Sequence, residues 1–195
     1  MIAGILLAAG RGRRFGGAKL TARLGKAGAV AGPGVEIGVL ACRSLRMVLP
    51  RVVAVVRPDD AELAACLAGA GAEVVACADA DRGMGTSLAC GVAAAADAGG
   101  WIVALADMPW VLPDTIRAVA DALAAGAPVA APFHEGRRGH PVGFGHAVLH
   151  ELLALAGDEG ARGILAQAPE RVLRIDVNDP GILRDVDVRE DLQPD

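Results

Sequence analysis

Residues 2–19 constrain the fold of this chain more than any other segment. An apolar run from Ile2 to Ala9 passes directly into a glycine-rich, basic loop that ends at Lys19. A short apolar run bounded by glycine is typical of a buried parallel strand. Four glycines within residues 10–17 let the backbone turn tightly and direct its N–H groups towards one centre. The alternative is a turn with solvated arginines, but cations around one loop repel each other unless an anion is present. The segment therefore predicts a strand followed by a polyphosphate-binding loop.

The loop matches neither of two common phosphate-binding motifs. A Walker loop places Ser or Thr directly after its lysine, whereas Leu20 follows Lys19 here. Gly10 and Gly12 match the first two glycines of the dinucleotide-binding motif Gly-x-Gly-x-x-Gly, but Phe15 occupies the position of the third. A dinucleotide-dependent oxidoreductase is therefore not expected.

Strand-like and helix-like segments alternate along the rest of the chain. Apolar strands are expected at residues 51–56, 73–77, 101–105 and 129–132, and helices at about 58–70, 86–98 and 113–125. This alternation predicts a doubly wound, Rossmann-like α/β fold, a three-layer sandwich around a mostly parallel sheet. Two segments interrupt it. Residues 25–38 are expected to form a mobile loop, and residues 137–145 an irregular hairpin or a substrate-facing loop.

Composition limits the partners of the protein. A net charge of −4 and a pI near 5.6 argue against a nucleic-acid-binding protein. The mean hydropathy is +0.42, yet no apolar run approaches the roughly 20 residues of a membrane span. The four cysteines form no Cys-x-x-Cys pair, which favours buried thiols over a metal or redox site. The arginines follow the first apolar run instead of preceding it, unlike in a signal peptide, so a cytoplasmic protein with no membrane partner is expected.

Two motifs outside the loop can carry chemistry. Asp107 follows an apolar run, and ligands of open α/β sheets bind beyond the carboxyl ends of the strands. A carboxylate there can bind the Mg²⁺ that accompanies a triphosphate, or it can simply cap a helix. Residues 83–88 read Gly-Met-Gly-Thr-Ser-Leu, in which Gly85, Thr86 and Ser87 can approach a base or ribose. The alternative for this segment is an ordinary Ser/Thr helix cap.

Three further motifs place charged residues in the second half of the chain. Residues 137–141 read Arg-Arg-Gly-His-Pro, where the arginines suit bidentate phosphate contacts and the histidine is either a ligand or structural. Asp158 and Arg162 either clamp a second substrate or lie at the start of a helix. Asp185 and Asp187 would share one face of a strand and point towards a metal, unless they are solvated acids before a terminal helix.

Taken in order, these motifs resemble the MobA-like NTP transferase family, specifically its molybdenum cofactor cytidylyltransferase branch. The matching segments are LAAGRGRRFGGAK, GMGTSL, LADMPW, GRRGHPVGF, GDEGAR and DVDVREDL, and they cover nearly the whole chain. The resemblance implies a fold of the nucleotide-diphospho-sugar transferase type in one domain, 1–195, with a nucleotide-binding half at about 1–110 and an acceptor-binding half at about 111–195. It also implies that a cytidylyl group moves from CTP to the terminal phosphate of molybdopterin, releasing pyrophosphate.

The resemblance assigns roles to individual residues. Lys19, Arg14 and Asp107 are expected to be catalytic, and Mg²⁺ is expected on Asp107 and on Asp187, which is favoured over Asp185. The expected nucleotide-binding residues are Leu7, Ala8, Ala9, Gly10, Arg11, Gly12, Arg13, Gly17, Lys19, Gly85, Thr86 and Ser87. The expected acceptor-binding residues are Arg138, Gly139, His140, Asp158 and Arg162.

Several alternatives stay open at this point. The sequence Ala8-Ala9-Gly10 resembles the cytidylyl-transferring branch, whereas guanylyl-transferring relatives tend to have Ala-Gly-Gly. Relatives also act on isoprenoid and sugar phosphates, so GTP or another NTP with a different phosphorylated acceptor is an alternative. A non-catalytic molybdenum cofactor carrier is another. A recipient molybdoenzyme is a further expected partner. The segment after Lys19 departs from the family pattern, which reads roughly Leu-Leu-x-x-Leu-x-Gly-x-Pro-Leu-Leu.

Overall fold

The computed structural model describes residues 1–12, 14–25 and 27–192. In this part of the chain a sheet of eight strands has the order β3-β2-β1-β4-β7-β5-β6, with β8 paired to β5. The strands are β1 (Ile2–Leu7), β2 (Arg51–Val56), β3 (Glu73–Ala76), β4 (Gly100–Leu105), β5 (Val129–His134), β6 (Arg137–Arg138), β7 (Val142–Gly145) and β8 (Val172–Asp176). Strands β1 to β4 are parallel and β8 is parallel to β5, whereas β7 and β6 run antiparallel to their neighbours. The predicted α/β fold with a mostly parallel sheet is confirmed.

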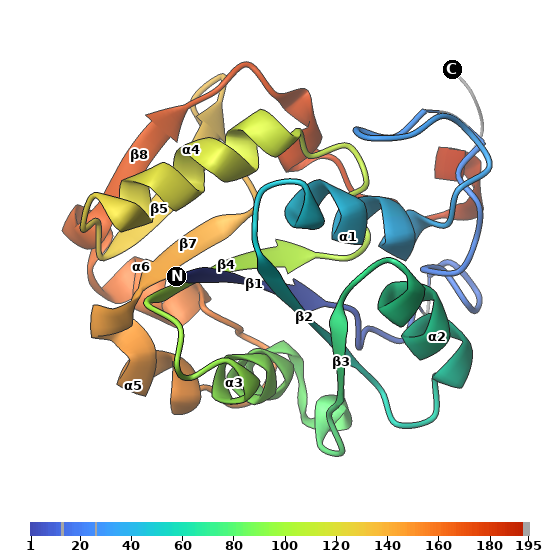
Figure 1. The fold of residues 1–195 in the computed structure, drawn as a ribbon, viewed down its shortest axis with the longest axis horizontal. Helices are drawn as coiled ribbons and strands as arrows, with labels where there is room; N and C mark the ends of the chain where they lie inside the picture. The colour runs from blue at the N-terminus through green and yellow to red at the C-terminus, as the bar shows by residue number, and fades with distance from the viewer. Residues whose placement is uncertain (13, 26, 193–195) are drawn as a thin grey trace.

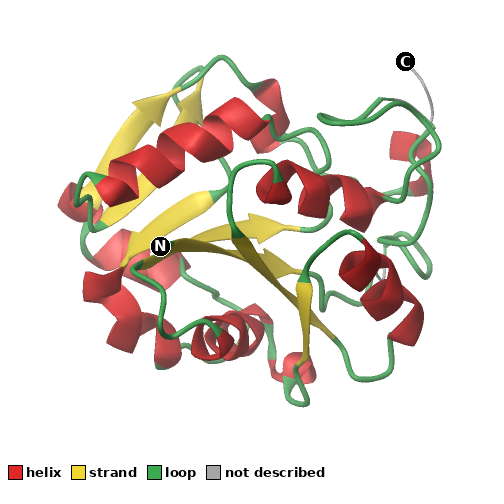
Figure 2. Ribbon diagram, in the orientation of Figure 1, coloured by secondary structure: helices red, strands yellow, loops and turns green. Residues whose placement is uncertain are grey.

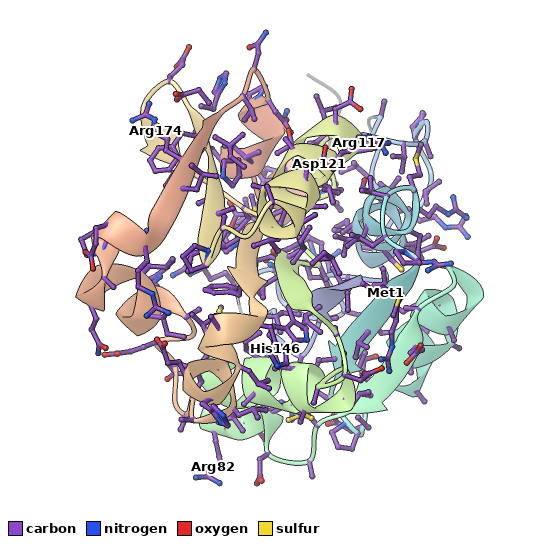
Figure 3. All side chains as sticks on the ribbon, turned by 60° about the vertical axis from the view of Figure 1, so that its left-hand side comes forward. Met1, Arg82, Arg117, Asp121, His146 and Arg174 are labelled. Carbon is purple, nitrogen blue, oxygen red and sulfur yellow. The ribbon has the colours of Figure 1, made fainter. Side chains whose placement is uncertain are left out.

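Helices cover both faces of this sheet (Figures 1 and 2). They are α1 (Ile37–Arg46), α2 (Ala61–Gly69), α3 (Met84–Ala94), α4 (Pro113–Ala124), α5 (Leu149–Leu153) and α6 (Arg162–Gln167). Side chains of α1, α2 and α4 fill one hydrophobic core, and those of α3, α5 and α6 fill the other. Charged side chains such as Arg82 and Arg174 extend outward from opposite ends of the molecule (Figure 3). The result is the expected three-layer sandwich.

Local sequence explains where several elements begin. Strand β1 is buried on both faces, which is why its sequence is continuously apolar instead of alternating. Helix α2 is capped by Asp60, whose carboxylate accepts a hydrogen bond from the Leu63 N–H at 3.3 Å. Helix α4 opens with Pro113, whose fixed φ and missing N–H suit the first turn. None of the helices in the described ranges combines the length and apolar character needed to cross a bilayer.

The chain departs from the predicted elements in a few places. Helix α1 and strand β8 were not anticipated. Helix α3 begins two residues before the predicted start and ends at Ala94, because the backbone turns at residues 95–98. The loop expected at 25–38 ends at Glu36, and α1 begins at Ile37. The segment 137–145 forms strands β6 and β7 within the sheet, but these strands pair with β5 and β4 and not with each other, so the expected hairpin within this segment is not formed.

The topology brings the loop after β1 and the C-terminal segment to the same edge of the sheet (Figure 1). The loop after β1 starts at the carboxyl ends of β1, β2 and β4. The C-terminal 3₁₀ turn η5 (Arg189–Leu192) lies against the continuation of that loop, where the Gly25 N–H donates to the Leu192 carbonyl at 2.8 Å (Figure 1). Ligands of such sheets bind at this edge, so the fold places the predicted site residues where a ligand is expected.

Candidate functional site

A cavity of about 470 Å³ opens at the carboxyl ends of β1 and β4. One wall is the glycine-rich loop, and the other is the 3₁₀ turn η1 (Ala80–Arg82) with the start of α3. Of the expected nucleotide-binding residues, those that line it are Leu7, Ala9, Gly10, Arg11, Gly12, Lys19 and Ser87. A second cavity, of about 440 Å³, adjoins it beyond Lys19 and includes Gly17. Volumes of this size suit a nucleotide-sized ligand.

Lys19 and Asp107 meet at the border of these cavities. Lys19 Nζ lies 2.7 Å from Asp107 Oδ2, and the two side chains are 13% and 24% exposed. Asp107 is positioned by the end of β4, where the Ala106 N–H donates to the Leu7 carbonyl. Lys19 and Asp107 both lie in turns beside the cavity, and Asp107 directly follows β4, so each can contact a phosphate or its counter-ion without large movement.

The loop owes its shape to one glycine and one aromatic side chain. Gly12 has φ +56°, and a Cβ there would lie 2.8 Å from the Gly17 carbonyl oxygen. The Lys19 N–H donates to that same carbonyl at 2.7 Å. Phe15, which replaces the third glycine of the dinucleotide motif, is only 4% exposed and anchors the loop in the core. Arg13, expected to bind nucleotide, lies outside the described residues.

Sequence reasoning missed Arg57 and Asp81, which complete the cavity. Asp81 accepts hydrogen bonds from both Arg11 and Arg57, so its carboxylate links the loop, the end of β2 and η1. These contacts, first with Arg57 and then with Arg11, hold the pKa of Asp81 well below its usual range. The position of Arg57 directly after the apolar strand 51–56 is the signal that could have identified it, since carboxyl ends of strands carry ligand-binding residues.

The Gly-Met-Gly-Thr-Ser segment packs closely against another loop. Gly83 has φ +118°, and a side chain there would clash with Asp158 and Gly157. The Gly85 N–H donates to the Gly157 carbonyl at 2.7 Å. Ser87 lines the larger cavity, whereas Gly85 and Thr86 are not among its lining residues. Asp158, expected on the acceptor side, lines this same cavity.

The remaining acceptor candidates gather around the β6–β7 connection. Gly139 is buried, and a Cβ there would clash with Ile182; the His140 N–H donates to the Ile182 carbonyl at 3.0 Å. Burial lowers the pKa of the His140 imidazole, and the charges of Arg138 and Arg162 lower it further, against the opposing effect of Asp107. The lowered pKa favours the neutral imidazole, which lies within electrostatic range of the Asp107 carboxylate and is hydrogen-bonded to the Val103 backbone.

The expectation of a strand carrying Asp185 and Asp187 is wrong. Residues 184–188 are irregular, held by a hydrogen bond from the Val186 N–H to the Asp107 carbonyl at 2.9 Å. Asp187 pairs with Arg14, with Arg14 Nη1 2.8 Å from Asp187 Oδ2. Burial, then Asp107 and Asp187, raise the pKa of Asp185. The segment thus brings the Asp185 carboxyl group within electrostatic range of Asp107, but without the shared face of a strand.

These carboxyl groups bear on the expected Mg²⁺. No group of three or more His, Cys, Asp and Glu side chains gathers as a metal-binding cluster within the described residues. Mg²⁺ in phosphoryl-transfer sites is commonly bound by one or two carboxylates together with substrate phosphates, so a full protein cage is not required. The carboxyl groups near Asp107 fit a metal that arrives with a nucleotide.

Comparison with known proteins identifies the family. A family model described as the MobA-like NTP transferase domain matches residues 4–172. The chain belongs to this family. No curated protein matches it.

Several solved structures share the fold. The chain is similar to Rv0371c from Mycobacterium tuberculosis H37Rv, with 26% identity over 97% of this chain and 94% of that chain and a TM-score of 0.78. A nucleotidyl transferase from Methanothermobacter thermautotroptrophicus gives 23% identity, coverage of 98% and 94%, and a TM-score of 0.79. Molybdopterin-guanine dinucleotide biosynthesis protein A from Archaeoglobus fulgidus gives 20% identity, coverage of 98% and 95%, and a TM-score of 0.65. A MobA-like NTP transferase binds a nucleoside triphosphate and a phosphorylated acceptor, and the two cavities beside Lys19 offer space for such ligands.

Proposed function

We propose that this chain is a Mg²⁺-dependent enzyme that transfers a cytidylyl group from CTP to the terminal phosphate of molybdopterin. The observation that carries the proposal is the Lys19–Asp107 pair at the border of two cavities beside a glycine-rich loop. A cation and a metal-binding carboxylate at one point are what an enzyme needs to bring two phosphates together. The reaction is proposed to occur in the cytoplasm, with a molybdoenzyme receiving the product.

The chemistry needs little from the protein beyond positioning and charge. The acceptor phosphate is already anionic at pH 7, so it attacks the α-phosphorus of CTP without a general base. The new bond forms between acceptor oxygen and α-phosphorus as the bond to the bridging oxygen breaks, and pyrophosphate leaves with that electron pair. In this proposal Lys19 and Arg14 stabilise the triphosphate charge, and the first loop directs its N–H groups at the phosphates.

Mg²⁺ is proposed to bind Asp107 and Asp187 together with the triphosphate. When bound, the ion neutralises phosphate charge and orients the α-phosphate. In the structure both carboxylates are paired with cations, Lys19 and Arg14, which are the two groups proposed to turn to the phosphates. Asp185 competes for the second position, because it lies within electrostatic range of both Asp107 and Asp187, although burial first and then these two charges raise its pKa. Separate Asp185→Ala and Asp187→Ala variants, titrated with Mg²⁺, distinguish the two.

The choice of CTP rests on the first loop. Ala9 lines the larger cavity, and its methyl group takes space that a glycine would leave for a larger base. GTP is the second candidate, since Asp81 and Asp158 line the cavity and a carboxylate suits the N–H donors of guanine. On the acceptor side Arg138, His140 and Arg162 are proposed to contact molybdopterin, with Asp158 between the two substrates.

Thermal unfolding with CTP, GTP, ATP and UTP, each with and without Mg²⁺, tests this proposal. A ligand at about 100 times its Kd adds roughly 2.7 kcal/mol of stability, which shifts the melting temperature measurably. We expect a Mg²⁺-dependent shift that is largest for CTP. A larger shift with GTP would favour guanylyl transfer, and no shift with any nucleotide would favour a non-catalytic cofactor carrier.

A further inference from the structure

A small cavity lies between α1 and the connection that carries His140. Apolar side chains such as Leu45, Met108 and Ile116 form most of its wall, and its volume is about 10 Å³. That volume is about what a single water molecule occupies when it is measured in this way. The cavity is separate from the two larger cavities at the glycine-rich loop, and His140 is the acceptor candidate that borders it.

Two polar atoms belong to residues that line this small cavity. Ser44 Oγ and His140 Nδ1 are both buried, and neither has a hydrogen-bond partner among the residues that the structure describes. A serine inside a helix often hydrogen-bonds to the carbonyl four residues before it, but Ser44 does not. Buried polar side-chain atoms are nearly always paired, either with protein or with ordered water. One ordered water in this cavity would therefore provide a partner for both atoms.

We propose that one ordered water bridges Ser44 Oγ and His140 Nδ1, and that Ser44 is thereby a positioning residue for the imidazole. The water can donate to one atom and accept from the other, so both are satisfied at once. The backbone of His140 is held by its hydrogen bond to Ile182, and the ring is hydrogen-bonded to the backbone of Val103. A water at Nδ1 gives the ring a second hydrogen bond and so restricts its orientation further.

The consequence for activity rests on the proposed function. With Nδ1 engaged by the water, the imidazole keeps a constant position beside the other acceptor candidates. Arg138 and Arg162, the cationic acceptor candidates, act on the same imidazole. Ser44, which no sequence motif singles out, then affects acceptor binding because it holds the water that restricts the His140 ring.

The bridge itself is tested without any substrate. A high-resolution crystal structure of the full chain should show a water within hydrogen-bond distance of both atoms, and an empty cavity would overturn the proposal. With ¹⁵N-labelled histidine, Ser44→Ala should shift the ring nitrogens of His140. Cys42→Ala is the matched control: it removes a buried group of similar size from the same helix, and the Cys42 thiol contacts the Ala70 carbonyl instead. An unchanged His140 spectrum in Ser44→Ala also refutes the bridge.

Kinetics test the positioning role. Ser44→Ala should raise the KM for the acceptor by about 10-fold or more, as for a misplaced binding group, and leave the KM for the nucleotide unchanged. Ser44→Thr, which keeps the hydroxyl, should restore much of the loss. Equal losses for both substrates, or the same loss in Cys42→Ala, would mean a general structural role and would overturn this one. If the unaltered protein shows no transfer at all, the proposed function fails, while the spectrum still decides on the bridge.

Discussion

Removing the Asp107 carboxylate should strengthen the binding of CTP in the absence of Mg²⁺ and should abolish turnover. Lys19 Nζ and Asp107 Oδ2 are 2.7 Å apart and largely shielded from solvent. Unit charges at that distance attract by about 6 kcal/mol at an effective dielectric constant near 20, before desolvation is subtracted. A charged hydrogen bond of this kind contributes a net of about 1.5–3 kcal/mol. Without Mg²⁺, a triphosphate must break this pair to reach Lys19.

The expected result for Asp107→Ala therefore has two parts. CTP in the presence of EDTA should bind about 10- to 100-fold more tightly, because the free energy of the Lys19–Asp107 hydrogen bond no longer has to be overcome. Turnover with Mg²⁺ should fall by at least about 1,000-fold, because a group that stabilises transition-state charge is lost. Calorimetric titration and pyrophosphate release measure the two effects.

A matched control shows whether the effects are specific to the carboxylate beside Lys19. Asp121→Ala removes an exposed carboxylate from α4 (labelled in Figure 3) and should change neither quantity. Unchanged or weaker CTP binding by Asp107→Ala in EDTA would refute the competition argument. Retained turnover would refute the role of Asp107.

Three further perturbations test close packing and paired carboxylates, at the cavity and elsewhere in the fold. Gly83→Ala combines a φ of +118° with a clash against the Asp158 loop, so we expect a loss of roughly 2–4 kcal/mol in urea unfolding together with weaker nucleotide binding; wild-type stability would contradict the close packing. Asp179→Ala removes a buried carboxylate that accepts from Thr115 and two backbone N–H groups, and should cost about 3–5 kcal/mol, whereas a loss under 1 kcal/mol would argue against it. The lowered pKa of Asp81 means that its ion pairs stabilise the fold above pH 4 and are lost as the pH falls below that value; Asp81→Asn should flatten this part of the stability–pH curve, and an unchanged curve would contradict the assignment.

Much of the fold could be predicted because single segments carried enough signal. Strand β1 and strand β4 are buried on both faces, so their apolar runs identify them without tertiary information. Helices α2 and α4 begin at a capping aspartate and a proline, which are local signals. Helix α1 has no side chain that caps its N-terminus and follows a glycine-rich loop, so its sequence gave no start signal. Strand β8 is largely exposed, and only its pairing with β5 defines it.

The positions of Lys19 and Asp107 could be predicted from the sequence, whereas the ion pairs around them could not. Lys19 and Asp107 end apolar strand–loop units, and the alternating topology alone brings such ends together. The ion pair of Arg14 with Asp187 joins residues 173 positions apart, and the wrong strand assignment at 185–187 hid how it forms. The link from Arg11 through Asp81 to Arg57 depends on how three loops approach one another, which no local pattern encodes. Whether Asp107 and its neighbours hold a metal stays a prediction.

Pyrophosphate release from CTP in the presence of Mg²⁺ and molybdopterin tests the central claim most directly. The assay should compare the unaltered protein with Asp107→Ala and with Asp121→Ala, and should replace CTP by GTP in parallel. We predict stoichiometric pyrophosphate and a cytidylylated pterin product from the unaltered protein and from Asp121→Ala, and neither product from Asp107→Ala. Absence of pyrophosphate from the unaltered, folded protein with CTP would contradict the proposed function.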